Sequence, residues 1–95
     1  MDMYIAELTK QLKTEGFPYV YEWQDGPGKV YQPHSHKGKV TFYLLEGSLT
    51  FDFSGQKRGV RAGERFDVPI GKTHSAIVGP NGASYLVGQE IDGDA

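Results

Sequence analysis

The 95-residue chain has no cysteine, no long apolar run and no dense cluster of basic residues. The absence of cysteine excludes disulfide frameworks and thiolate metal sites. No apolar stretch approaches the roughly 20 residues that span a bilayer, and the start, MDMYIAELTK, lacks the basic region of a secretion signal. The ten Lys and Arg are scattered, and the net charge is −2. We therefore expect a cytoplasmic protein that binds neither nucleic acid nor a membrane.

Turn-forming and aromatic residues are plentiful instead. Thirteen glycines and five prolines punctuate short aromatic and β-branched runs, and aromatics make up 13% of the chain. This pattern predicts an all-β fold. The length predicts a single domain over 1–95, with a core so small that barrel closure, a metal or a partner chain must support it.

Only residues 2–15 show a helical pattern. Leu8 and Leu12 recur at helical spacing among good helix formers. Asp2 is placed to cap the start, and Gly16 stands where a left-handed residue would end the helix. We predict one short N-terminal helix with a single apolar face.

Residues 17–90 have the pattern of short strands separated by turns, including a turn predicted at 79–82. The predicted strands are 19–23, 29–32, 39–45, 48–53, 56–61, 65–68, 73–78 and 84–90. About eight short strands at this spacing indicate a β-barrel or jelly-roll sandwich.

Three histidines are the residues most suited to chemistry. His34 and His36 are two apart, so on a strand their side chains would face the same way. Imidazole is a good ligand for divalent transition metals, and His74 is the one further histidine available as a third ligand. An isolated histidine on a strand is more often solvated or hydrogen-bonded, so the pair by itself leaves both readings open.

The surrounding residues resemble the two motifs of the cupins. Residues 28–47 follow the first, G-x5-H-x-H-x3-4-E-x6-G, and residues 63–78 follow the second, G-x5-P-x-G-x2-H-x3-N, at every glycine, proline and histidine. The resemblance implies a double-stranded β-helix that holds one divalent metal on three histidines and often a glutamate. It assigns His34, His36 and His74 as metal ligands.

Two positions depart from the motifs. Val40 stands in place of the glutamate, and Val78 in place of the asparagine. Alternation along the strands directs both side chains inward. We therefore predict three imidazoles against an apolar wall of Val40, Phe42, Ala76 and Val78. Without a carboxylate ligand, the ion keeps its full formal charge and favours an anionic ligand.

The resemblance implies a small-molecule ligand and leaves the metal open among Zn, Fe, Ni and Mn. Three-histidine cupin sites resemble those of thiol dioxygenases and diketone-cleaving dioxygenases, so one expectation is a dioxygenase-type oxidoreductase. The alternative is a non-catalytic module that binds a small ligand or metal, with the metal mainly structural. No catalytic residue is assigned. Six polar or aromatic residues are candidates for the pocket mouth, although for each of them a packing or surface role is the favoured interpretation: Tyr21, Tyr31, Tyr43, Tyr85, Gln89 and Glu90.

An aromatic stripe on the first strand predicts association. Tyr19, Tyr21 and Trp23 alternate on one face, as expected for core or for a dimer seam. Together with the helix they predict a homodimer. Asp25 is expected at a turn, residues 37–39 in a flexible loop, and residues 91–95 in a polar tail.

Overall fold

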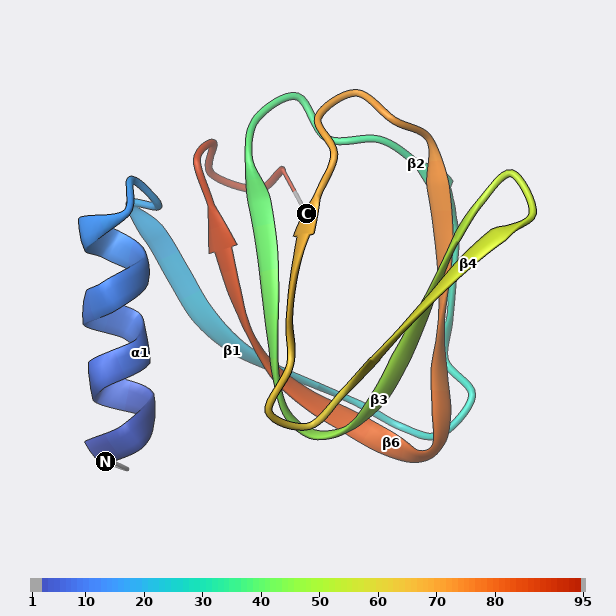
Figure 1. Ribbon diagram of the computed structural model, residues 1–95, viewed down its shortest axis with the longest axis horizontal. Helices are drawn as coiled ribbons and strands as arrows, with labels where there is room; N and C mark the ends of the chain where they lie inside the picture. The colour runs from blue at the N-terminus through green and yellow to red at the C-terminus, as the bar shows by residue number, and fades with distance from the viewer. Residues whose placement is uncertain (1–2, 95) are drawn as a thin grey trace.

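The computed structural model describes residues 3–94 and consists of one helix packed against a rolled, wholly antiparallel sheet (Figure 1). The elements are α1 (Met3–Thr14), β1 (Tyr19–Asp25), β2 (Val30–His34), β3 (Val40–Phe53), β4 (Gln56–Arg61), β5 (Arg65–Val68) and β6 (His74–Gln89). The predicted all-β double-stranded β-helix with one short N-terminal helix is confirmed. Asp2, the predicted helix cap, lies outside the described residues.

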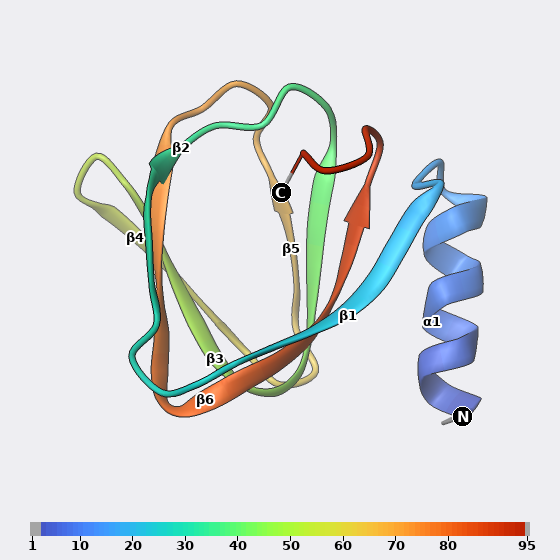
Figure 2. The same cartoon turned by 180° about the vertical axis from the view of Figure 1, so that it is seen from behind.

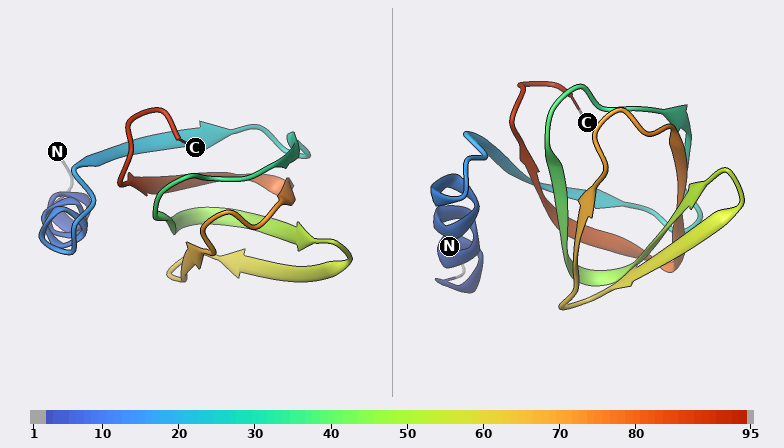
Figure 3. Two further views of the ribbon diagram at one scale, coloured as in Figure 1. Left: turned by 90° about the horizontal axis from the view of Figure 1, so that it is seen from above. Right: turned by 45° about the horizontal axis from the view of Figure 1, so that its top comes forward.

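Two long strands form the spine of the sheet. β3 and β6 pair along most of their length, and each bends so that its two parts lie on different sides of the barrel. The first part of β6 pairs with β2 and its last part with β1, while the two parts of β3 pair with β5 and β4 (Figure 2). The rolled sheet is seen along two further directions in Figure 3.

The prediction of eight strands is wrong, because two predicted turns lie inside strands. Residues 39–45 and 48–53 join in β3, and the turn predicted at 79–82 lies within β6. Both strands bend at the same place, where the register shifts between Gly47 and Leu49. Gly47 has a φ of 72°, and a Cβ there would overlap the carbonyl oxygen of Gly82. Glycine therefore allows the bend without breaking the ladder.

The core lies inside the roll and under α1. Inward-facing residues of β3 and β6, such as Leu44, Phe51 and Val87, are almost fully buried. Leu8 and Leu12 bury the apolar face of the helix, which ends at Thr14. Gly16 follows it with a φ of 107°, the left-handed conformation predicted there. No helix within residues 3–94 has the length and apolar character needed to cross a membrane.

Candidate metal centre

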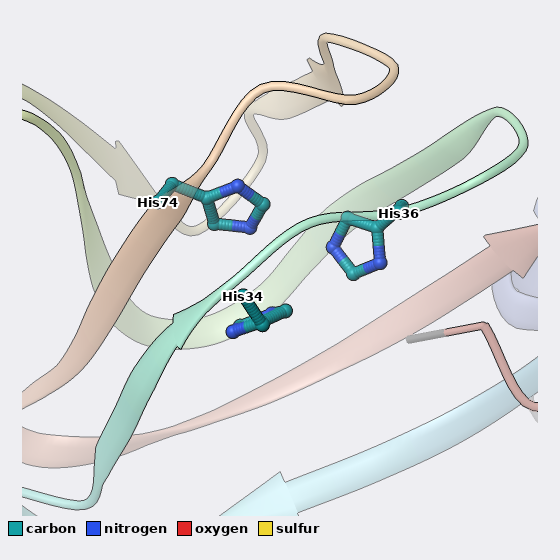
Figure 4. A group of neighbouring side chains, drawn as sticks. All are labelled: His34, His36 and His74. Atoms are coloured by element: carbon teal, nitrogen blue, oxygen red, sulfur yellow. The ribbon is translucent and has the colours of Figure 1, made fainter.

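Strand pairing brings the three histidines together at one rim of the barrel (Figure 4). His34 is the last residue of β2 and His74 the first of β6, and the two are direct partners in the ladder. His36 lies in the loop 35–39, between β2 and β3, so strand alternation does not account for the way it faces His34. The backbone N–H of Gly71 donates to the carbonyl of His36 at 2.9 Å, which ties this loop to the one that precedes His74.

The three rings form a compact triangle. Their centroids lie 5.0 Å apart for His34 and His36, 4.6 Å for His34 and His74, and 5.0 Å for His36 and His74. One nitrogen from each ring can be chosen so that all three lie within 4.8 Å of one another. His36 and His74 are each 1% exposed, and His34 is half-buried. Three converging imidazoles of this kind could surround a single ion.

Hydrogen bonds fix which nitrogen of each ring is available. The three Nδ1 atoms donate to backbone carbonyls, His34 to Gln32 at 2.6 Å, His36 to Asp94 at 2.7 Å and His74 to Lys72 at 2.9 Å. A carbonyl only accepts, so Nδ1 carries the proton and Nε2 keeps its lone pair. The buried Nε2 atoms of His36 and His74 have no hydrogen-bond partner among the described residues.

This donor set fits a divalent transition metal. Metal-binding histidines characteristically donate their other N–H to a carbonyl or carboxylate, as all three do here. Burial lowers the pKa of His74, which keeps the ring neutral and able to bind a cation near pH 7. The orphaned Nε2 atoms would each carry a desolvation cost that a metal ligand bond removes.

The histidines open onto a cavity of about 170 Å³. Its lining residues are Tyr21, Trp23, Tyr31, His34, His36, Phe42, Leu49, Phe51, His74, Ala76, Tyr85 and Val87. Phe42 and Ala76 form part of the wall, as predicted. Val40 and Val78 do not line it: both are buried, at 1% and 2% exposure, within the hydrophobic core. Besides Phe42 and Ala76, the apolar wall consists of Leu49 and Phe51 of β3, Val87 of β6 and aromatic rings of β1, β2 and β6.

Asp25, expected at an exposed turn, is the centre of a hydrogen-bonded cluster beside the cavity. It ends β1, is half-buried and accepts from Tyr31 at 2.8 Å, from Tyr85 at 2.7 Å and from the indole N–H of Trp23 at 3.1 Å. Burial, reinforced by the bond to Asp25, raises the pKa of the Tyr85 hydroxyl. Burial also raises the pKa of Tyr31. Both phenols are therefore protonated donors near neutral pH.

Three of the six residues predicted for the mouth line the cavity, namely Tyr21, Tyr31 and Tyr85. Tyr43 instead exchanges a hydrogen bond with the hydroxyl of Tyr4 at 2.8 Å. Gln89 lies behind the wall and donates to the Tyr21 hydroxyl at 2.8 Å, whereas Glu90 is exposed and accepts from the backbone N–H of Lys39 at 3.2 Å.

Sequence reasoning missed Asp94 as well as Trp23 and Asp25. Residues 91–95 were expected to form a polar tail, yet the backbone and carboxylate of Asp94 contact the loop that carries His36. The partners are 56 to 58 residues apart, so no local spacing pattern could have indicated the contact.

Comparison with known proteins agrees with this architecture. Residues 21–86 match the family model described as "Cupin domain". The chain is 32% identical over 63 residues to the dimethylsulfoniopropionate lyase DddW of Ruegeria pomeroyi, a match that covers 66% of this chain and 41% of that protein. The chain thus spans less than half of this relative.

Solved structures share the fold. The polyketide cyclase RemF from Streptomyces resistomycificus matches with a TM-score of 0.65 and 28% identity, over 76% of this chain and 54% of that one. KdgF from Halomonas sp. matches with a TM-score of 0.64 and 22% identity, over 79% of this chain and 71% of that one. A cupin-2 domain protein from Shewanella frigidimarina matches with a TM-score of 0.63 and 20% identity, covering 72% and 65% of the two chains.

Proposed function

The chain belongs to the cupin family, and we propose that it binds one divalent metal ion through His34, His36 and His74 and uses it on a small molecule in the cavity. One observation carries the proposal. The Nδ1 atoms of all three histidines are engaged by carbonyls, while the Nε2 atoms of His36 and His74 are buried without a partner. An ordinary buried histidine would satisfy both nitrogens.

The reaction we propose is a dioxygenase-type oxidation. A bound iron ion would supply O2 activation or Lewis acidity at open coordination positions. The chain supplies an apolar pocket, and none of the described residues that line it is a carboxylate or an amine. The phenols of Tyr31 and Tyr85 are held as donors to Asp25, so they shape the cavity wall and do not act as bases at neutral pH. These cavity walls are therefore suited to an oxidation in which no protein side chain has to act as a base.

Metal loading followed by oxygen uptake tests this proposal. The metal-free chain would be reconstituted separately with Fe2+, Zn2+, Ni2+ and Mn2+, and bound metal measured by elemental analysis. We expect close to one equivalent, and we expect the iron form to consume O2 when supplied with a small thiol or diketone. Metal below a tenth of an equivalent after reconstitution would refute metal binding; a loaded protein without oxygen uptake across the substrate panel would refute the oxidation.

A lyase reaction is the second candidate. Its support is the 32% identity to a dimethylsulfoniopropionate lyase over two thirds of this chain. The metal-loaded protein would be incubated with dimethylsulfoniopropionate under anaerobic conditions and the mixture followed by NMR. Metal-dependent loss of the substrate without O2 would favour the lyase over the oxidation, whereas an unchanged spectrum would remove this candidate.

A non-catalytic role with a mainly structural metal is the third. The histidines join β2, β6 and the loop 35–39 in a domain with a small core, so an ion would secure these elements. A loaded protein that melts higher than the metal-free one, and turns over neither substrate class, would support this role.

A homodimer is also proposed. Tyr19, Tyr21 and Trp23 are not in the core of the chain but are 43%, 37% and 51% exposed, and they lie on β1, which pairs on one side with β6. Such an aromatic face on an edge strand favours a second copy as its partner. Light scattering after size exclusion would decide, with a mass of one chain excluding the dimer.

A further inference from the structure

The segment 90–94, which follows β6, folds back onto the loop 35–39 at the metal-site rim (Figure 3). Asp94 makes two kinds of contact there. Its backbone carbonyl accepts from Nδ1 of His36 at 2.7 Å, and its carboxylate accepts from the backbone N–H groups of Lys37 at 3.0 Å and Gly38 at 2.9 Å. One residue therefore holds both the His36 ring and the backbone next to it.

His36 differs in this from the other two histidines. His34 and His74 donate to Gln32 and Lys72, each two residues earlier in the chain, so strand and turn geometry fix their rings locally. The partner of His36 comes from 58 residues away. The orientation of this ring therefore depends on whether the segment 90–94 is docked.

Further contacts hold the segment in place. The backbone N–H of Gly93 donates to the side chain of Gln89 at 3.2 Å, and Gln89, 1% exposed, donates in turn to the hydroxyl of Tyr21 on the cavity wall. The backbone N–H of Glu90 also donates to the carbonyl of Lys39 at 3.0 Å. The docked segment is thus connected to both the His36 loop and the cavity.

The segment 90–94 also packs closely against the loop 35–39 at Gly38. A Cβ placed on Gly38 would lie 2.9 Å from the carboxylate of Glu90 and 3.0 Å from the side chain of Ile91. Gly38 is buried although it lies in a loop. The absence of a side chain at this position lets the segment approach the loop, so the contact extends beyond Asp94.

We propose that Asp94 is a positioning residue for the metal ligand His36, so that docking of the segment 90–94 sets the metal affinity of the site. The inference rests on the proposed metal binding. The Asp94 carboxylate holds its own carbonyl where it accepts the Nδ1 proton, which leaves Nε2 free toward the ion. Loss of an outer partner of a metal-binding histidine typically lowers metal affinity about 10–100-fold.

Three variants of the full chain test this role. Asp94→Ala removes the carboxylate that anchors the segment, Asp94→Asn keeps an acceptor oxygen, and Asp92→Ala is a matched control that removes an exposed carboxylate from the same segment. Zn2+ affinity of each metal-free protein would be measured by competition with a chromophoric chelator. We expect Asp94→Ala to bind about 10–100-fold more weakly, Asp94→Asn to recover part of the loss, and Asp92→Ala to match the unmodified chain.

A second readout follows the rings themselves without metal. In 15N-histidine NMR of the metal-free proteins, we expect His36 to lose its single Nδ1–H tautomer in Asp94→Ala while His34 and His74 keep theirs. An Asp94→Ala variant with unchanged affinity, or with an unchanged His36 tautomer, would overturn the proposal. If the unmodified chain bound no Zn2+, metal binding itself would fail, and the tautomer comparison would still decide whether Asp94 positions His36.

Discussion

Hydrogen bonding differs between two ends of the cavity, a histidine end lined by His34, His36 and His74 and an aromatic end lined by Tyr31 and Tyr85. At the histidine end, His36 and His74 are anchored from outside, and their inward nitrogens have no partner among the described residues. At the aromatic end, the hydroxyls of Tyr31 and Tyr85 both donate to Asp25. The first end has unused binding capacity, whereas the second is satisfied within the chain.

This difference separates a ligand-binding function from a shaping function. A buried polar atom without a partner costs about 1–3 kcal/mol, which an incoming metal ion would recover. The satisfied phenols offer no such gain, but their bonds to Asp25 hold two rings in fixed positions on the cavity wall. We therefore infer that the histidine end binds the ion and that the aromatic end defines the space for the small molecule.

The largest expected effect is the loss of a histidine. His36→Ala removes a ligand and not merely its support, so metal affinity should fall by more than the roughly 100-fold upper range for an outer partner. His34→Ala and His74→Ala should behave alike in the same chelator competition. Asp25→Asn, at the opposite end, is the control and should keep the affinity of the unmodified chain. Equal losses of metal affinity in Asp25→Asn and His36→Ala would contradict the assignment of metal binding to the histidine end alone.

The next effect is that of metal on stability. A metal ion that binds only the folded state, at a free concentration 100 times its Kd, raises the free energy of unfolding by about 2.7 kcal/mol. For a domain of this size that corresponds to an increase in Tm of roughly 10–20 °C, measured by calorimetry with and without Zn2+. The triple alanine variant of His34, His36 and His74 should show no such increase. If it did, the ion would be acting elsewhere on the chain.

At the aromatic end, Asp25→Ala should destabilise the fold without affecting metal binding. It leaves the hydroxyl of Tyr85, a residue only 4% exposed, without its acceptor, at a cost of about 1–3 kcal/mol in urea unfolding. Tyr85→Phe removes the donor of the same hydrogen bond. The double variant Asp25→Ala with Tyr85→Phe should therefore lose less stability than the sum of the two single variants. Strict additivity would show that the two groups do not interact.

The smallest effect is expected outside both ends, at the ion pair between Arg65 and Glu15 that ties the residues after α1 to the barrel. The hydrogen bond from Arg65, helped by one from Gln11, lowers the pKa of Glu15 from 4.5 to about 2. A lowered carboxyl pKa stabilises the fold above pH 4.5, and this contribution disappears as the pH falls toward 2.

Because the side chains of Arg65 and Glu15 are partly exposed, at 25% and 36%, solvent screens the pair, and Glu15→Gln should cost less than about 1 kcal/mol at pH 7. Urea unfolding at pH 7 and pH 2 measures the difference from the unmodified chain, which should vanish at the lower pH. Metal affinity at pH 7 should be unchanged. A difference that grew as the pH fell would contradict the assigned pKa direction.

The histidine end could be predicted from the sequence because its ligands lie in two compact motifs. The resemblance of these motifs to those of the cupins assigned His34, His36 and His74 as ligands, and His34 and His74 are ladder partners in the structure. The aromatic end could not be predicted in the same way. Asp25 meets Tyr85 across 60 residues, and only the pairing of β1 with β6 brings them together.

The predicted strand boundaries at Gly47 and at 79–82 were wrong for a related reason. Gly47 and the run 79–82 have the local composition of turns, but in the rolled sheet they mark the shared bend of β3 and β6. Local propensity cannot distinguish a turn that reverses the chain from a bend that continues its ladder, since cross-strand partners decide between them. Contacts of Asp94 with the His36 loop are equally long-range.

The most direct test of the central claim is a titration of the metal-free chain with Co2+, followed by its visible absorption. We predict saturation at one equivalent, a spectrum typical of imidazole ligands, and loss of the signal in His36→Ala. Failure to saturate, or equal binding by the variant that lacks all three histidines, would contradict a metal centre at His34, His36 and His74.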